Sequence, residues 1–232
     1  YRASMFIVPS TIASAVRFPL GMSAGVLGPR PQQQLVLYEF EACPFCRKVR
    51  EALTILDLDV LVRPAPHGGT RFRPEAVALG GKSQFPLLID PNYNVKLYES
   101  DDIIEHLFAH YGAGKPPFGL RMGMFGNAMS GLASAMRAGS GGRARPSTTP
   151  AQPLELWSFE ASPYARRARE VLCELELPYV LHNVGRGSQK RDEMRARAGK
   201  VQVPYLEDPN TGTKMFESRD IVRYLRTTYG TA

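Results

Sequence analysis

The sequence predicts a mixed α/β protein made of two copies of one module, each built around a central sheet. Two observations support this prediction. The segment LVLYEFEACPFCRKVREAL, starting at Leu35, returns as LELWSFEASPYARRAREVL, starting at Leu154. In both copies, short apolar and β-prone runs alternate with segments whose apolar residues have helical spacing. This order of elements is typical of a sheet with helices packed against it.

The duplication continues beyond these segments in one register. Pro86 matches Pro204, and YESDDIIEHLFAHYG from Tyr98 matches FESRDIVRYLRTTYG from Phe216. The offset between the copies is 119 residues at Cys43 and 118 from Pro86 onward, so a single one-residue gap aligns them. Chance similarity does not keep register over such a length, and we interpret the chain as an internal duplication.

Each copy is expected to contain a strand, a helix that follows a proline turn, a second strand, a variable basic stretch, two further strands and a final amphipathic helix. The strands expected in the first copy are Leu35–Tyr38, Val60–Arg63, Phe85–Asp90 and Lys96–Tyr98. Those expected in the second copy are Leu154–Trp157, Tyr179–Asn183, Val203–Asp208 and Lys214–Phe216. The helices of the first copy are indicated by apolar residues at helical spacing, namely Val49, Leu53 and Leu56, then Ile103, Ile104, Leu107 and Tyr111.

The predicted modules occupy residues 35–112 and 154–232, with a basic extension over 1–34 and a Met- and Gly-rich linker over 113–153. The first repeat has 8 basic and 11 acidic residues, and the second has 13 and 11. The extension and the linker have three and five basic residues and no acidic ones, so the net charge of +7 comes from the connecting segments. Nucleic-acid binding is not expected, because no basic face interleaved with aromatic residues is present.

The motif Cys43-Pro44-Phe45-Cys46 starts the first predicted helix. A cysteine just before a helix is stabilised as a thiolate by the helix dipole and by free N–H groups. We therefore predict Cys43 as the attacking nucleophile and Cys46, one turn later, as the resolving thiol. The adjacent Arg47 and Lys48 are expected to add positive charge near the thiolate.

The second copy has Ser162-Pro163-Tyr164-Ala165 at the equivalent place and is predicted to be redox-inactive. Two other interpretations of the first copy stay open. The cysteines could form half of a zinc site, although the sequence shows no second pair of ligands and no metal is expected. They could also be an inactive relic. The remaining cysteine, Cys173, is expected to be buried and inert, and three cysteines in all favour a reducing compartment.

The order β-CPFC-α-β-(α)-[FV]P-β-β-ES-α resembles the thioredoxin fold, and it is most similar to glutaredoxins and to the N-terminal domain of glutathione transferases. The two copies together resemble tandem proteins of this kind from plants, algae and cyanobacteria. The resemblance covers both repeats and leaves out residues 1–34 and 113–153. It does not include the helical C-terminal domain of a complete transferase, which argues against a conventional conjugating enzyme.

The resemblance implies glutathione as a ligand. In the first copy it implies a cis peptide bond between Phe85 and Pro86, a Phe85 backbone that pairs with the cysteinyl part of glutathione, and a Glu99-Ser100 pair that holds the γ-glutamyl end. The corresponding residual site of the second copy comprises Ser162, Val203, Pro204, Glu217 and Ser218. The prolines could instead be ordinary strand starts, and the Glu-Ser pairs could be helix caps.

These observations favour a glutaredoxin-like thiol–disulfide oxidoreductase that acts on glutathione or a protein disulfide, with the second copy used for binding. The competing hypothesis is a non-catalytic accessory subunit that docks on a thylakoid or photosystem-like membrane complex through residues 118–138 and 1–34. The acid-free N-terminus also resembles the end of an organelle transit segment. We therefore expect a plastid protein, in the stroma or at the thylakoid surface, with the cytoplasm as the alternative.

Overall fold

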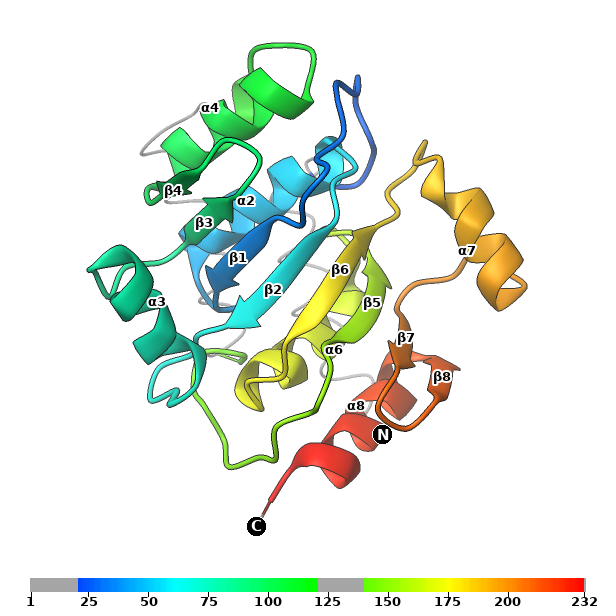
Figure 1. Cartoon of the computed structure of the whole chain (residues 1–232). Helices are drawn as coiled ribbons and strands as arrows, with labels where there is room; N and C mark the ends of the chain where they lie inside the picture. The colour runs from blue at the N-terminus through cyan, green and yellow to red at the C-terminus, as the bar shows by residue number, and fades with distance from the viewer. Residues whose placement is uncertain (1–20, 121–139, 232) are drawn as a thin grey trace.

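The computed structural model describes residues 21–120 and 140–231 and shows two modules of the same mixed α/β architecture (Figure 1). The first module contains β1 (Val36–Glu39), α2 (Pro44–Ile55), β2 (Val60–Pro64), α3 (Phe72–Gly80), β3 (Leu87–Asp90), β4 (Val95–Leu97) and α4 (Ser100–Tyr111). The second contains β5 (Leu154–Ser158), α6 (Pro163–Glu174), β6 (Tyr179–Asn183), α7 (Lys190–Ala198), β7 (Tyr205–Asp208), β8 (Thr213–Phe216) and α8 (Ser218–Tyr229). A short 3-10 helix, η2 (Phe118–Leu120), follows α4.

The fold agrees with the predicted order of strands, and it adds one helix to each module. Helices α3 and α7 occupy the segments that the residue pattern presented only as variable and basic, where the family resemblance included an optional helix. The apolar spacing that marks a helix is weak there, since each of these helices buries a single residue, Ala76 or Met194.

The two modules share one continuous sheet. Its eight strands have the order β4-β3-β1-β2-β6-β5-β7-β8. The modules meet where β2 and β6 pair antiparallel, with Leu61 opposite Val180 at the centre of the register. Leu61 and Val180 are equivalent positions of the two repeats, so the modules are related by a local two-fold axis at this pair. Figure 1 shows β2 and β6 side by side in the middle of the molecule.

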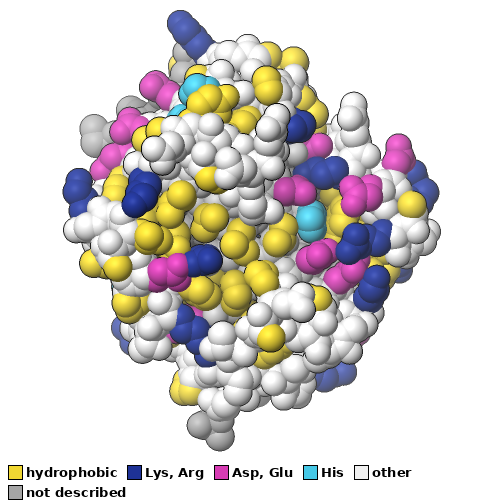
Figure 2. Space-filling model, viewed as in Figure 1, with side chains coloured by type: hydrophobic (Ala, Val, Ile, Leu, Met, Phe, Trp, Pro, Cys, Tyr) yellow, Lys and Arg dark blue, Asp and Glu magenta, His cyan; other side chains and the backbone are white. Residues whose placement is uncertain are grey.

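The two faces of the sheet are covered differently (Figure 1). Helices α2, α4, α6 and α8 lie on one face and form the main core with inward-pointing strand residues such as Leu37, Val62 and Leu156. On the opposite face, α3 packs against β1 and β2, and α7 packs with Trp157 of β5 and Tyr205 of β7. Figure 2 looks onto that face, where apolar side chains gather near α3 and charged side chains surround a histidine toward α7.

A buried ionic network joins the modules beneath the sheet. Arg50 on α2 and Arg169 on α6 are equivalent residues, and so are Glu41 and Glu160, which follow β1 and β5. Arg50 Nε donates to Glu160 Oε2 at 2.9 Å, and Arg169 Nε donates to Glu41 Oε2 at 3.1 Å. All four side chains are buried. Each module therefore supplies an arginine to the glutamate that precedes its partner's helix.

The network also buries charged residues of α6. Arg166 and Arg169 are buried at the contact between the modules and pair with Glu41 and Glu160. These charged residues of a helix therefore belong to the interface between the modules. No local sequence pattern distinguishes such residues from charges exposed to solvent.

The described parts of the extension and the linker follow equivalent paths. Ser23 bridges to Arg186 and Leu27 to Gly112, while Arg143 bridges to His67 and Ser147 to Gly230. Each segment thus begins on one module and ends on the other. The printed sequence contains a signal of this longer repeat, since IASAVR at 12–17 resembles LASAMR at 132–137. The duplication therefore extends beyond the two predicted modules.

Residues 1–20 and 121–139 lie outside the described residues, so most of the predicted docking segments are not part of this description. Within residues 21–120 and 140–231, no helix combines the length and the apolar character that crossing a bilayer would need.

Candidate active site

Cys43 is placed by the turn between β1 and α2. It is the N-cap residue of α2, with Pro44 at the first helical position, where a missing N–H costs little. The Cys43 backbone N–H donates to Phe40 O at 3.0 Å, and the Cys46 N–H donates to Cys43 Sγ at 3.3 Å. Both cysteines are reduced and buried, with Cys43 only 3% exposed. The helix start therefore presents N–H groups to the Cys43 sulfur as the sequence predicted.

The two thiols differ in acidity. Hydrogen bonds from the Cys46 thiol and from the Cys46 and Phe45 N–H groups lower the pKa of Cys43 below its usual value, against the opposing effect of burial. Burial raises the pKa of Cys46 well above its usual value. Cys43 is consequently the better thiolate, and Cys46 holds its proton. This difference fits an attacking residue followed by a resolving one.

The basic residues next to the motif have other partners. The sequence suggested that Arg47 and Lys48 would add positive charge near the thiolate. Arg47 instead pairs with Glu51 at 3.1 Å, and Lys48 is buried and pairs with Asp101. The thiolate is stabilised mainly by hydrogen bonds, and the two cations are neutralised by carboxylates.

Phe85 approaches Cys43 through its backbone. The Phe85–Pro86 peptide bond is cis, and Phe85 O lies 4.0 Å from Cys43 Sγ. The Phe85 ring packs elsewhere: Arg73 lies over it at 4.5 Å from its centroid, and the Phe40 ring meets it edge-on at 6.2 Å. The main chain of Phe85 therefore faces Cys43, and its ring is held by other contacts.

Glu99 and Ser100 lie at the start of α4. Glu99 is the N-cap residue with a φ of 59°, and its side chain makes no capping hydrogen bond. Its carboxylate instead accepts a hydrogen bond from the Gln84 side chain, just before Phe85. Ser100 is the first helical residue and is buried. The helix-cap interpretation of this pair is therefore not supported. Glu99 stands at the N-cap but its side chain makes no capping hydrogen bond, and Ser100 lies inside the helix.

The second module repeats this geometry without a thiol. Ser162 is the N-cap of α6, and its Oγ accepts the Ala165 N–H at 3.2 Å. The Val203–Pro204 peptide bond is also cis. Glu217 has a φ of 69° and accepts from Gln202, as Glu99 does from Gln84. The ligand-facing backbone is therefore preserved where the dithiol is lost.

Several titratable residues outside the motif escaped the sequence analysis. Glu39, at the end of β1, is buried, and burial raises its pKa to about 7 against the opposing charge of Arg50. Its counterpart in the second module is Ser158. Glu39 raises the pKa of both Cys43 and Cys46 by its charge. A carboxylate directly after the predicted strand Leu35–Tyr38 was the available signal.

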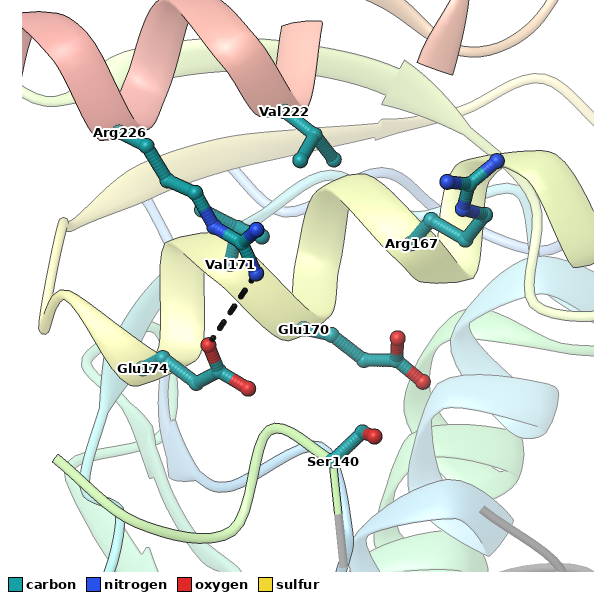
Figure 3. Close-up of a pocket in the computed structure, with 7 residues that line it drawn as sticks. All are labelled: Ser140, Arg167, Glu170, Val171, Glu174, Val222 and Arg226. Carbon is teal, nitrogen blue, oxygen red and sulfur yellow. Dashed lines mark ion pairs between the residues drawn. The ribbon is translucent and has the colours of Figure 1, made fainter. Parts of the chain in front are cut away.

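A pocket that neither cysteine of the dithiol lines lies in the second module (Figure 3). Its volume is about 210 Å³, and it is lined by α6, α8 and Ser140 of the linker. Glu174 at its edge pairs with Arg226 at 3.8 Å and Arg145 at 3.1 Å, and accepts the Gly141 N–H at 3.2 Å. These bonds make Glu174 an anchor for the linker. Among the described residues, no group of histidine, cysteine and carboxylate side chains could hold a metal ion.

Comparison with known proteins places these features in context. A family model described as glutathione S-transferase, N-terminal domain, matches residues 37–116 and again residues 156–232. Among solved structures, Bombyx mori glutathione transferase BmGSTD1 is 25% identical, with 40% of this chain and 45% of that chain covered and a TM-score of 0.34. Leishmania TDR1, a trimeric glutathione transferase, is 16% identical, with 86% and 68% covered and a TM-score of 0.31. The chain thus spans less than half the length of the Bombyx mori enzyme. No curated protein matches it.

Proposed function

The chain belongs to the family of glutathione S-transferase N-terminal domains and carries that domain twice, and on this premise we propose that its first module is a glutathione-dependent thiol–disulfide oxidoreductase. The observation that carries the proposal is the arrangement of Cys43. Its sulfur accepts the Cys46 N–H at 3.3 Å and faces the Phe85 carbonyl at 4.0 Å. A sulfur stabilised as a thiolate beside the backbone carbonyl of Phe85 suits attack on a peptide-like disulfide.

The proposed reaction begins with a protein thiol linked to glutathione by a disulfide. The Cys43 thiolate attacks the glutathione sulfur, so that a Cys43–glutathione disulfide forms and the protein leaves as a thiolate that takes up a proton. A second glutathione, as its thiolate, then attacks this disulfide. Oxidised glutathione is released, and Cys43 returns as a thiolate. Alternatively, Cys46 loses its proton and attacks Cys43, which releases glutathione and leaves a Cys43–Cys46 disulfide for two further glutathione molecules to reduce.

Glutathione would lie along the segment from Phe85 to Ser100. The Phe85 backbone would pair with its cysteinyl part, and Glu99 would meet the amino group of its γ-glutamyl end. Glu99 suits this role because its carboxylate is exposed and is oriented by Gln84. The opposite charges of a carboxylate and an ammonium group favour the contact.

The deciding experiment measures glutathione-dependent reduction of a glutathionylated peptide by the purified chain. Activity should disappear in Cys43→Ser and persist in Cys46→Ser, because the second glutathione can resolve the mixed disulfide without Cys46. Ser162→Ala is the matched control in the second module and should keep full activity. A reduced, folded wild-type protein that shows no turnover would contradict the proposal.

A second function is favoured by the preserved geometry of the second module. We propose that this module binds glutathione without redox chemistry, through the Val203 backbone, Glu217 and Ser218. Titration calorimetry with reduced glutathione should detect two sites in the wild type. Glu217→Gln should weaken one and Glu99→Gln the other. Binding at a single site that is insensitive to Glu217→Gln would contradict this role.

The cellular setting is a separate proposal. We propose a plastid location, with the cytoplasm as the alternative, and docking on a membrane complex through residues 118–138 and 1–34. Support comes from the acid-free, basic composition of these segments. Fractionation after a salt wash tests it: the full chain should remain with membranes, and a chain lacking residues 118–138 should be released.

A further inference from the structure

Glu41 is held by the second module although it belongs to the first. It stands two residues before Cys43, in the turn from which the thiol projects. Arg169 Nε donates to Glu41 Oε2 at 3.1 Å, and Arg169 Nη2 donates to Glu41 Oε1 at 3.2 Å. The Glu41 backbone N–H donates to the sulfur of Cys173 at 3.4 Å. Both the side chain and the main chain of this residue are thus fixed by helix α6.

The same construction occurs at the mirror position. Glu160 stands two residues before Ser162, and Arg50 Nε donates to it at 2.9 Å. The Glu160 backbone N–H donates to Thr54 Oγ1 at 3.2 Å. Thr54 is the counterpart of Cys173, so each module provides one arginine and one side-chain acceptor to its partner's turn. Only one of the two turns leads to a thiol.

From these contacts we infer that Arg169 and Cys173, in the module without the dithiol, are positioning residues for Cys43. The inference rests on the proposed role of Cys43 as nucleophile. One residue, Ala42, separates Glu41 from Cys43, so a displacement of Glu41 moves the N-cap. In its present position the Cys43 sulfur accepts the Cys46 N–H at 3.3 Å. A bidentate arginine–carboxylate pair fixes direction as well as distance and therefore holds the turn firmly.

Loss of Arg169 would act on Cys43 through the turn. A looser turn weakens the hydrogen bonds that favour the thiolate. The thiolate fraction of Cys43 at neutral pH would therefore fall.

The test measures the alkylation rate of Cys43 by iodoacetamide across pH in the full chain, with the modified peptide identified by mass spectrometry. Arg169→Gln and Cys173→Ala should slow alkylation at neutral pH by roughly five- to tenfold, because the rate follows the thiolate fraction. Cys173→Thr should restore the wild-type rate, since threonine is the acceptor at the mirror position. Thr54→Val is the matched control and should leave the rate unchanged, because the two bonds that it removes, to Glu160 and to Asn183, do not hold the turn of Cys43.

Coupling through Glu41 is tested by a double-mutant cycle. If Arg169 acts through this residue, Arg169→Gln should add little to the effect of Glu41→Gln, whereas independent effects would add. Additive effects, or a wild-type pH profile in folded Arg169→Gln and Cys173→Ala, would overturn the inference. Should Arg169→Gln fail to fold, the comparison of Cys173→Ala with Cys173→Thr decides. The assay needs no glutathione, so its outcome is independent of whether the proposed reductase activity exists.

Discussion

Arg50 of the first module and Glu160 of the second form a buried ion pair of 2.9 Å across the contact between the modules. Arg169 and Glu41 form the mirror pair at 3.1 Å. Within its own module Arg50 also pairs with Glu39 and lies 3.3 Å from Glu41, and Arg169 lies 2.8 Å from Glu160. Together with Arg166, these charges compensate one another where water is excluded, and removal of any one disturbs that compensation.

Glu160→Gln is expected to lower the free energy of unfolding by about 3–5 kcal/mol, because it leaves Arg50 and Arg169 buried with one carboxylate fewer. Urea denaturation at neutral pH measures this change. The exposed pair of Arg223 and Asp220 is the control, and Asp220→Asn should change stability by less than about 1 kcal/mol. Equal effects of the two substitutions would show that the network is not a main source of stability.

The pairing of Glu160 with Arg50 and Arg169 also predicts how the free energy of unfolding depends on pH in the acid range. The arginines hold the pKa of Glu160 at about 2 despite its burial, below its ordinary value of 4.5. A group with a depressed pKa stabilises the fold above its unfolded value, and this contribution is lost as the pH falls from about 4.5 to about 2. Stability measured over this range should fall in the wild type and should fall less steeply in Glu160→Gln. A wild-type slope retained in the variant would assign acid lability to other groups.

Glu39→Gln is expected to lower the pKa of Cys43 further and to speed its alkylation at neutral pH. The reason is that the Glu39 charge raises the pKa of the thiol. Since the pKa of Glu39 is raised to about 7, its ionisation grows as the pH rises through neutrality. The wild-type alkylation profile should therefore be broader than a single titration and become simple in the variant. An unchanged profile would exclude this electrostatic coupling.

Two glycines with the same φ of +73° allow a test of how closely the linker packs. A Cβ at Gly141 would lie 2.8 Å from the Glu41 Cβ, whereas a Cβ at Gly212 would meet nothing within 4 Å. Gly212→Ala should cost about 1–2 kcal/mol for the left-handed backbone alone. Gly141→Ala should cost about 1–3 kcal/mol more, because the side chain overlaps the active-site turn. Thermal unfolding of both variants measures the difference, and equal losses would argue against tight packing.

The first module alone, over residues 21–120, is expected to form a two-fold dimer. A second copy can offer β2, Arg50, Glu41 and Thr54 where the full chain offers β6, Arg169, Glu160 and Cys173. A free β2 would otherwise leave an unpaired strand edge and a buried cluster of charges exposed. Sedimentation over a range of concentrations measures the mass of the isolated module. A stable monomer would show that the module does not need a partner surface.

The duplication, the order of strands and the placement of Cys43 at a helix start were predicted from the sequence. Turn residues and apolar periodicity are local properties, so the strand bounds agree to within a residue or two. Phe85 shows the limit of this reasoning: the third strand begins at Leu87, after the cis Phe85–Pro86 bond, and not at Phe85. The direction of the Phe85 ring depends on Arg73 and Phe40, which no local pattern connects to it.

The sequence by itself determined two thioredoxin-like modules of which one carries a dithiol. The tertiary structure alone decided that β2 and β6 join them into one sheet, and that Arg169 contacts Glu41 across 128 residues of chain. The physical reason is that strand periodicity specifies which face is buried, but not which edge is paired. Likewise, the sequence around an arginine on a helix is the same whether the side chain is exposed to solvent or buried in an ion pair. Only the surface that packs against the helix determines which of the two occurs.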